Sequence, residues 1–297
     1  MGIILNCLVM ALLCQGVVAE SDIASQYAVQ EIELPGVPNA RQLGGYAIGA
    51  RKVRMNVLLR TGTLAQATDQ AVAALQEKYN LAFVADFRTS LERDAAPDRD
   101  VVGATNVALP VLEKMISGEE AASAMGALRR GKHDSSVVLE VLREPQLQAA
   151  LGGIYDYIVF DKDHQRSFAA FLDRLVALPE GRAVLWHCSQ GKDRCGWGSA
   201  FVLAALGADR SLTVADFALS NVPYAEEIEA LASYARENGM EDELIDYIYL
   251  YKGVSVAFFE KTLDAIDFKY GSILNYMEQE LDLSSDDRRI LMDKFLE

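Results

Sequence analysis

The sequence predicts an α/β domain with a central sheet flanked by helices, and three observations support this fold class. Residues 182–187 and 81–87 are short, mostly apolar runs with the length of buried strands. Residues 197–206 form an apolar, Ala-rich stretch that is typical of a buried helix. Helical patterns also dominate residues 111–173 and the chain from residue 212 onward. Helices packed on a sheet accommodate both kinds of segment.

The composition indicates a globular chain with a substantial core. Of 297 residues, 51% are apolar and 24% are charged, which is unlike a disordered acidic segment. We expect a single domain, since one core can serve roughly 250 to 300 residues. The net charge of −15, from 28 basic and 43 acidic residues, argues against a nucleic-acid-binding protein, which needs a surplus of Lys and Arg.

The negative charge is concentrated near the C-terminus. Residues 225–297 contain 18 acidic and 7 basic side chains, a net charge of −11, while the rest of the chain carries only −4. This acidity either covers solvated helix faces or forms a docking surface for a basic partner.

Residues 1–19 have the features of a secretory signal peptide. They contain no charged side chain, are apolar from residue 3 to residue 14 except for Asn6, and end in Val17-Val18-Ala19. This segment is too short to span a bilayer, and no other stretch is long and apolar enough, so we expect no stable membrane anchor. The predicted product is a domain of residues 20–297 that is secreted or periplasmic.

The elements follow in order along this domain. Residues 31–110 contain short strands and one helix near residues 68–79, which leads into the strand at 81–87. Residues 111–173 form a long, mostly helical connection, and a connection of that length in a compact domain is usually functional. Residues 182–206 then supply a strand, a loop and a helix.

Two cysteines belong to the predicted domain. Cys7 and Cys14 lie in the signal segment, which leaves Cys188 and Cys195 and excludes a disulfide-stapled scaffold. Neither has companions at zinc-ligand spacing, and the chain has only three histidines. We therefore expect neither a metal site nor another cofactor.

The loop between the predicted strand and helix has the composition of an anion site. It begins with Cys188 and ends with Arg194, with Gly191 between them. A strand, a tight loop and a helix N-terminus aim backbone N–H groups at one anion, and this field favours the thiolate of Cys188. Arg194 can hold two phosphate oxygens. A thiolate beside such a cradle is suited to hydrolysing phosphate monoesters through a phosphocysteine.

The same residues carry a resemblance to a known family. The sequence His187-Cys188-Ser189-Gln190-Gly191-Lys192-Asp193-Arg194 resembles the Cys-x5-Arg signature of cysteine-dependent protein tyrosine phosphatases, and its Gly-Lys-Asp-Arg ending is similar to that of a secreted bacterial branch. Four further segments resemble motifs of that branch in the same order, so that the similarity spans about residues 31–296: they are residues 39–46, 59–62, 83–98 and 270–281.

The resemblance implies roles for the loop. Cys188 corresponds to the nucleophile, Arg194 to the phosphate-binding arginine, and Asp193 to the acid that protonates the tyrosyl oxygen. Lys192 corresponds to a lysine that offers charge to a second phosphate. The backbone and side chains of the remaining loop residues are expected to bind phosphate, and these are Ser189, Gln190 and Gly191. Residues 111–173 correspond to helices that cover the active site, either as a lid or as a permanently packed subdomain.

Residues outside the loop have open alternatives. Asp86 and Arg88 either bind phosphate, with Asp86 as the second candidate for the acid, or pair with each other at the end of the sheet. His187 is expected to orient the loop and stabilise the thiolate. Arg41 is either a structural tie or part of the anion site. The polar surroundings of His133 and His164 predict that both are solvated.

Two residues depart from the family pattern. Gln42 replaces an acidic residue, so an ion pair at that position is lost. Cys195 replaces Thr or Ala, and a thiol donates more weakly than a hydroxyl to the sulfur of Cys188, which predicts slow breakdown of a phosphoenzyme. Cys195 could instead trap an oxidised Cys188 as a disulfide, or simply pack as a small apolar residue.

These observations predict a hydrolase, a protein phosphatase acting through Cys188. Phosphotyrosine protein is the expected substrate, and a phosphoinositide or inositol phosphate is the alternative that Lys192 allows. A rhodanese-type sulfurtransferase also uses a Cys loop, but Arg194 at the loop end argues against it. A phosphate-binding module without turnover would not need the thiol.

Overall fold

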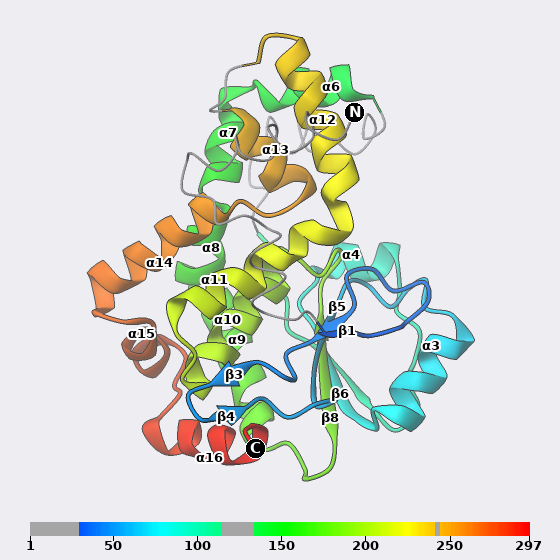
Figure 1. Cartoon of the computed structure of the whole chain (residues 1–297), viewed down its shortest axis with the longest axis vertical. Helices are drawn as coiled ribbons and strands as arrows, with labels where there is room; N and C mark the ends of the chain where they lie inside the picture. Colours follow the sequence, from blue (N-terminus) through cyan, green and yellow to red (C-terminus); the bar gives the residue numbers. More distant parts are fainter. Residues whose placement is uncertain (1–29, 115–133, 241–243) are drawn as a thin grey trace, which may run out of the picture.

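The computed structural model describes residues 30–114, 134–240 and 244–297, so the predicted signal peptide and His133 lie outside the described residues. Its centre is a six-stranded sheet with the strand order β1-β2-β5-β8-β6-β7 (Figure 1). The strands β5, β8, β6 and β7 run parallel, whereas β1 and β2 are antiparallel to their neighbours. The strand bounds are β1 (Gln30–Glu31), β2 (Arg41–Gln42), β5 (Leu58–Thr61), β6 (Leu81–Asp86), β7 (Thr105–Ala108) and β8 (Ala183–His187), with a separate pair of β3 (Ala47–Ile48) and β4 (Arg51–Lys52).

The strand β8 lies in the middle of the parallel part, between β5 and β6. Its last residue, His187, is in register with Thr61 of β5 and with Asp86 of β6. The carboxyl ends of three parallel strands therefore meet at one level, which is where open α/β sheets place their functional loops. The predicted strands at 81–87 and 182–187 are confirmed by β6 and β8, and the predicted α/β class is confirmed.

Alternating side chains of β8 divide the core into two layers. Ala183 and Leu185 face α3 and η2, where they join a cluster that contains Ala71 and Leu75. Val184 and Trp186 face the larger cluster, which includes the aromatic residues of α9 and α10. The predicted helix at 68–79 is observed as an α-helix followed by a π-helical turn, and the two elements on this face are α3 (Asp69–Ala73) and η2 (Ala74–Lys78).

The larger layer covers the other face of the sheet. Helix α10 lies at its centre and is buried along almost its whole length, in agreement with the helix predicted at 197–206, although it begins four residues earlier, at Asp193. Gly207, at φ 92°, ends it in the left-handed conformation that glycine favours. The helices of this layer are α8 (Ile154–Phe160), α9 (Lys162–Val176), α10 (Asp193–Leu206), α11 (Arg210–Ala218), α14 (Val256–Tyr270), α15 (Ile273–Glu280) and α16 (Ser285–Phe295).

A group of helices lies at the upper end of the molecule in Figure 1, beyond the carboxyl ends of the parallel strands. We call this group the upper helices, and they are α6 (Ser135–Leu142), α7 (Pro145–Gly152), α12 (Ala225–Glu237) and α13 (Ile245–Lys252). The predicted lid range of 111–173 therefore contributes to two places: α6 and α7 join the upper helices, while Phe168 and Phe171 of α9 pack in the main core. Two short elements flank the site, namely α4 (Ser90–Ala95) and η3 (Leu219–Tyr224).

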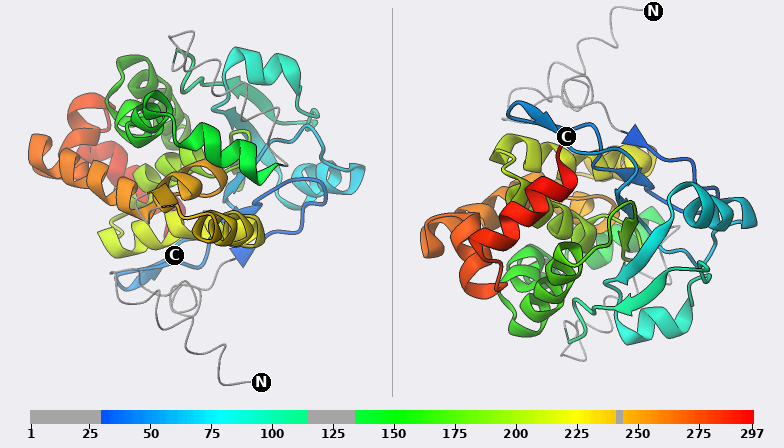
Figure 2. Two further views of the ribbon diagram at one scale, coloured as in Figure 1. Left: turned by 90° about the horizontal axis from the view of Figure 1, so that it is seen from above. Right: turned by 90° about the horizontal axis from the view of Figure 1, so that it is seen from below.

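The last residues of the chain pair with its N-terminal part. Val53 forms a β-bridge with Leu296, and the amide of Lys52 donates to the carbonyl of Glu297 at 2.9 Å. The view from below in Figure 2 shows α16 and the C-terminus beside the strands near β3 and β4. Within the described ranges, no helix has the length and apolar character that crossing a membrane requires.

Candidate active site

The predicted catalytic loop connects β8 to α10. Its conformation depends on Gly191, which has φ 70°, and a Cβ there would lie 2.5 Å from the carbonyl carbon of Thr61. Glycine alone permits both this backbone conformation and this close approach to β5. The loop is thus pressed against the end of the neighbouring strand.

Cys188 begins this loop and is buried. Burial by itself would raise the pKa of its thiol, but a hydrogen bond from Cys195 and the charge of Arg194 lower it from 9.0 to about 5. Cys188 is therefore a thiolate at neutral pH, which is the form that acts as a nucleophile. Both cysteines are free.

Arg194 lies in the first turn of α10 and is paired with Glu92 of α4. Its Nη1 and Nη2 donate to the two carboxylate oxygens of Glu92 at 2.6 and 2.9 Å. Ser189 of the loop also donates to Glu92, at 2.5 Å. Although burial favours the neutral acid, these hydrogen bonds and the guanidinium charge hold the pKa of Glu92 well below its usual value. Glu92 thus joins the arginine to the loop.

The position of Glu92 is fixed by its own helix. Thr89 and Glu92 form a capping box at the N-terminus of α4, in which the Thr89 side chain accepts from the Glu92 amide and the Glu92 carboxylate accepts from the Thr89 amide. Glu92 lies in the family segment at residues 83–98, where the sequence predicts no role for it. The spacing of Thr89 and Glu92 is the sequence signal that locates the helix start, but it does not reveal the partner at position 194.

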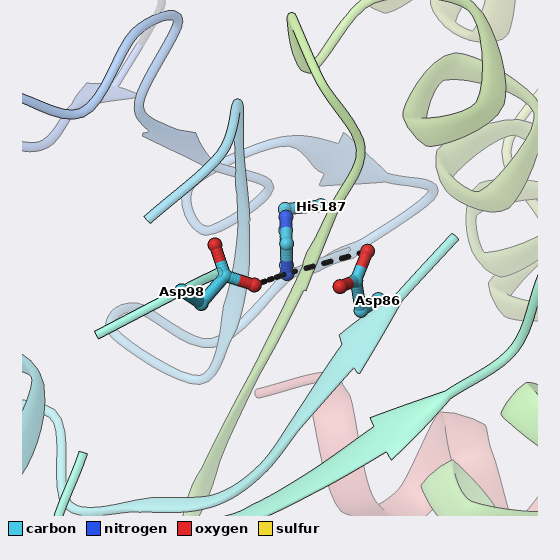
Figure 3. A group of neighbouring side chains, drawn as sticks. All are labelled: Asp86, Asp98 and His187. Carbon is cyan, nitrogen blue, oxygen red and sulfur yellow. Dashed lines mark ion pairs between the residues drawn. The ribbon is translucent and has the colours of Figure 1, made fainter. Parts of the chain in front are cut away.

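Asp86 and Arg88 are paired with each other, which is one of the two predicted alternatives. Arg88 Nη2 lies 2.7 Å from Asp86 and 2.5 Å from Asp98, and its Nη1 donates to the carbonyl of Ala96. Figure 3 shows that Asp86 and Asp98 flank the ring of His187. His187 Nε2 lies 3.1 Å from Asp98, and although burial lowers the pKa of His187, Asp98 and Asp86 raise it above its usual value.

Three of these residues could be considered as metal ligands. Ligand atoms of Asp86, Asp98 and His187 all lie within 4.8 Å of one another. Arg88, however, already donates to both carboxylates, so the two acidic side chains are balanced by two cationic ones when His187 is protonated. The group is better described as an ion network behind the loop than as a cation site.

Lys192 and Asp193 are neighbours at the junction of the loop and α10, and Lys192 Nζ lies 3.6 Å from a carboxylate oxygen of Asp193. Lys192 is buried, and its ammonium donates to three backbone carbonyls, those of Leu250, Tyr251 and Gly253. Asp193 is partly exposed and accepts a hydrogen bond of 3.1 Å from the hydroxyl of Tyr155. Of the two, Asp193 is the side chain with solvent access.

A buried ion cluster supports the loop from the side of β2 and β5. Asp216 of α11 pairs with Arg60 at 2.6 Å and with Arg41 at 3.5 Å, and Arg60 also donates to the carbonyl of Gly191 at 2.9 Å. Burial favours the neutral form of Asp216, but the two guanidinium groups keep its pKa below the usual value. Arg41 is therefore a structural tie, one of the alternatives the sequence left open. Asp216 and Arg60 are not among the residues predicted for the site, although an aspartate within the apolar pattern of 212–219 is a signal for a buried ion pair.

The rim of the site includes Gln190 and Tyr224. Gln190 is exposed, and its carbonyl accepts a hydrogen bond of 2.9 Å from the hydroxyl of Tyr224 at the end of η3. Burial and the negative charge of Cys188 both raise the pKa of Tyr224, so this hydroxyl remains protonated as a donor. The structure thus brings together Cys188, Ser189, Gly191 and Arg194 in one loop, with His187 and Cys195 beside Cys188.

The sequence was compared with those of known protein families. Residues 32–297 match the sequence model of the tyrosine phosphatase family. The chain belongs to the tyrosine phosphatase family. It is an enzyme, a tyrosine phosphatase, as the sequence predicted.

Two relatives of this phosphatase align over most of its length. A protein of Cupriavidus necator whose name places it among the tyrosine-protein phosphatases is 28% identical over 88% of this chain and 87% of its own. The triple specificity protein phosphatase PtpB of Mycobacterium tuberculosis is 28% identical over 82% of this chain and 92% of its own. Among solved structures, TpbA of P. aeruginosa superposes with a TM-score of 0.29 and 19% identity, covering 75% of this chain and 95% of TpbA.

One expectation about the phosphatase is wrong. His164 was predicted to be solvated, but it is buried, and its Nε2 accepts a hydrogen bond of 2.8 Å from the amide of Leu112. Its Nδ1 lies 3.0 Å from the carbonyl of Tyr157, which assigns the proton to Nδ1. The polar neighbours in the sequence belong to the exposed side of α9, whereas His164 lies on the side that faces residues 109–112.

Proposed function

We propose that this phosphatase hydrolyses phosphotyrosine in proteins through a phosphocysteine on Cys188. The observation that supports this most directly is a buried thiol whose pKa is lowered to about 5, in a loop that ends with Arg194. A thiolate at neutral pH needs no separate base, so the remaining task is to hold the phosphate and stabilise its charge.

The reaction has two steps that balance in atoms and charge. In the first, the Cys188 sulfur forms a bond to phosphorus while the bond from phosphorus to the tyrosyl oxygen breaks. Asp193 gives that oxygen its proton, a role that its partly exposed carboxyl group supports. In the second step, the Asp193 carboxylate takes a proton from water while the water oxygen forms a bond to phosphorus. The bond from phosphorus to sulfur breaks, the sulfur leaves as a thiolate, and inorganic phosphate is released.

Arg194 and the loop amides would stabilise the transferring phosphoryl group in both steps. Arg194 retains its Nε for a phosphate oxygen, because the hydrogen bonds to Glu92 use Nη1 and Nη2. Phosphoserine and phosphoinositides are the alternative substrates. PtpB is named a triple specificity phosphatase, and we propose that this chain likewise accepts more than one class of phosphorylated substrate.

We also propose that residues 1–19 direct export of the protein and that α6 and α7 cover the active site.

The test is a comparison of wild type with Cys188→Ser on p-nitrophenyl phosphate, a phosphotyrosine peptide, a phosphoserine peptide and a phosphoinositide. Wild type should hydrolyse the phosphotyrosine peptide with the highest kcat/KM, and Cys188→Ser should be inactive on all four. Acid-quenched wild type should carry phosphate on the peptide that contains Cys188. Turnover by Cys188→Ser, or a phosphate trapped on another residue, would refute the phosphocysteine mechanism.

A further inference from the structure

The buried ammonium of Lys192 is connected to a part of the fold that is distant in sequence. The side chain of Lys192 is 5% exposed, and Nζ donates to the carbonyls of Gly253 at 2.6 Å, Leu250 at 3.0 Å and Tyr251 at 3.2 Å. The carboxylate of Asp193 lies farther from Nζ, at 3.6 Å. An ammonium group has three hydrogens, so these three acceptors use its full donor capacity. In this arrangement Lys192 has no hydrogen left for a substrate.

The three acceptors belong to the C-terminus of α13. This helix ends at Lys252 and has Gly253 as its C-cap, so the carbonyls of Leu250 and Tyr251 lie in its last turn. Carbonyls in the last turn of a helix lack partners within the helix and carry the negative end of its dipole. A buried cation at this position donates hydrogen bonds to these carbonyls and is attracted by the negative end of the dipole. Lys192 supplies this cation from the loop between β8 and α10.

The segment after α13 is also fixed to η3. Asn221 accepts from the amide of Val254 at 2.6 Å and donates to its carbonyl at 3.0 Å. A Cβ on Gly253 would lie 2.2 Å from the Asn221 side-chain oxygen, so no larger residue fits without a shift. The end of α13 is therefore held in one position relative to the loop, with Lys192 as the direct link.

We infer that Lys192 is a positioning residue that fixes the catalytic loop to the C-terminus of α13, and that it is not the determinant for a second phosphate on the substrate. This inference rests on the proposed phosphatase mechanism. It makes the backbone carbonyls of Leu250, Tyr251 and Gly253 part of the support of the active site, although they lie about sixty residues after the loop in the sequence.

Loss of the contact between Lys192 and α13 should slow the hydrolysis of all substrates equally. The amides of residues 188–194 must surround the phosphate, and Lys192 is the residue before α10 begins. If its link to α13 is removed, the loop loses one of its fixed points, and misplacement by about 1 Å can reduce turnover about a hundredfold. A residue that binds a second phosphate would instead affect only substrates that carry one.

The experiment compares Lys192→Met with Lys252→Met. Lys252 lies in the last turn of the same helix, but its ammonium pairs with Glu227 at 3.1 Å. We expect Lys192→Met to lower kcat by a common factor of about ten to a hundred on p-nitrophenyl phosphate, a phosphotyrosine peptide and a bisphosphorylated phosphoinositide. The pH at which iodoacetamide alkylates Cys188 at half its maximal rate should also move upward. Lys252→Met should change neither quantity.

Gly253→Ala provides a second test that leaves Lys192 intact. Its added methyl group should displace the carbonyl that lies nearest to Nζ, and it should lower kcat on all three substrates in the same proportion. This variant keeps the inference testable if Lys192→Met does not fold, which circular dichroism and thermal unfolding would reveal.

Two results would overturn the inference. One is a rise in KM limited to the bisphosphorylated substrate, which would mean that Lys192 binds it. The other is a lower unfolding temperature with unchanged kcat and unchanged alkylation, which would mean a purely structural role. Activity in Cys188→Ser would instead refute the proposed mechanism, so the two failures can be told apart.

Discussion

The guanidinium of Arg194 is bound by both carboxylate oxygens of Glu92, at 2.6 and 2.9 Å, across 102 residues of sequence. A planar, two-point contact fixes the orientation of an arginine as well as its position. Because the same carboxylate accepts from Ser189 and caps α4, it aligns the arginine with the loop before any substrate arrives.

We therefore predict that Glu92→Gln lowers kcat/KM about ten- to a hundredfold, because the amide replaces one charged acceptor by a donor facing Arg194. Steady-state kinetics on a phosphotyrosine peptide measures the effect. Glu113→Gln is the matched control, since Glu113 bonds to Ser90 at the start of the same helix but is exposed. Equal kcat/KM values for Glu92→Gln and wild type would show that Arg194 is oriented by other contacts.

The second prediction concerns Cys195, whose thiol lies 3.5 Å from the carbonyl of Thr61 and also lowers the pKa of Cys188 by hydrogen bonding to its thiolate. Since a hydroxyl donates more strongly than a thiol, Cys195→Thr should stabilise the leaving sulfur and speed breakdown of the phosphoenzyme. Rapid-mixing experiments should show a burst of product in wild type that becomes smaller in Cys195→Thr and larger in Cys195→Ala. A burst of the same size in all three proteins contradicts this role.

The third prediction concerns Asp193 as the acid. Asp193→Asn cannot protonate the leaving oxygen, so it should slow a substrate with a poor leaving group far more than one with a good leaving group. The measurement is kcat for a series of aryl phosphates with increasing phenol pKa. The slope against that pKa should be steeper in Asp193→Asn. Equal slowing across the series would exclude Asp193 as the acid, and Asp86→Asn would then be examined in the same way.

The fourth prediction concerns the stability of the buried ion cluster. Asp216→Asn leaves Arg60 and Arg41 without a counter-charge in the interior, and breaking a buried pair typically costs about 3 to 5 kcal/mol of unfolding free energy. Urea denaturation measures this loss. Asp264→Asn removes an exposed partner of Arg210 and should change the midpoint little. If both variants unfold at the same urea concentration, the cluster does not stabilise the fold.

The fifth prediction concerns pH and the two buried histidines. Burial lowers the pKa of His164 below 6.5, so the unfolded chain binds the proton first and stability falls as the pH drops below that value. Asp98 and Asp86 raise the pKa of His187, so its contribution is complete below 6.5 and is lost as the pH rises through the raised value. Imidazole NMR titrations should separate the two, with His187 titrating above His164. The reverse order would contradict both assignments.

The parts of this enzyme that depend on local sequence could be predicted. The runs that form β6 and β8 are apolar over a strand length, and the loop between β8 and α10 carries its chemistry within seven consecutive positions, from Cys188 to Arg194. The family relationship was also evident from these residues. Local pattern sufficed because each of these features lies within one segment.

The supporting contacts could not be predicted, because their partners are far apart in the sequence. Asp216 meets Arg60 across 156 residues, and Lys192 meets Gly253 across 61. The prediction for His164 failed for a related reason. Its polar neighbours in the sequence suggested that it is exposed, but one side of α9 is buried in the fold and includes His164. The periodicity of apolar residues indicates which side of a helix is buried, but it does not indicate which polar groups a buried side chain will contact.

The central place of β8 also has a consequence for how the chain matures. The strands β5 and β6 are complete by residue 86, yet the strand that separates them is not synthesised until residue 187. Until then both present unpaired edges, which is the kind of surface that chaperones protect and that aggregates form on. Because Cys188 follows β8 directly, the residue proposed as the nucleophile is synthesised only after the strand that completes the sheet, and a nascent chain that stalls before β8 lacks this thiol.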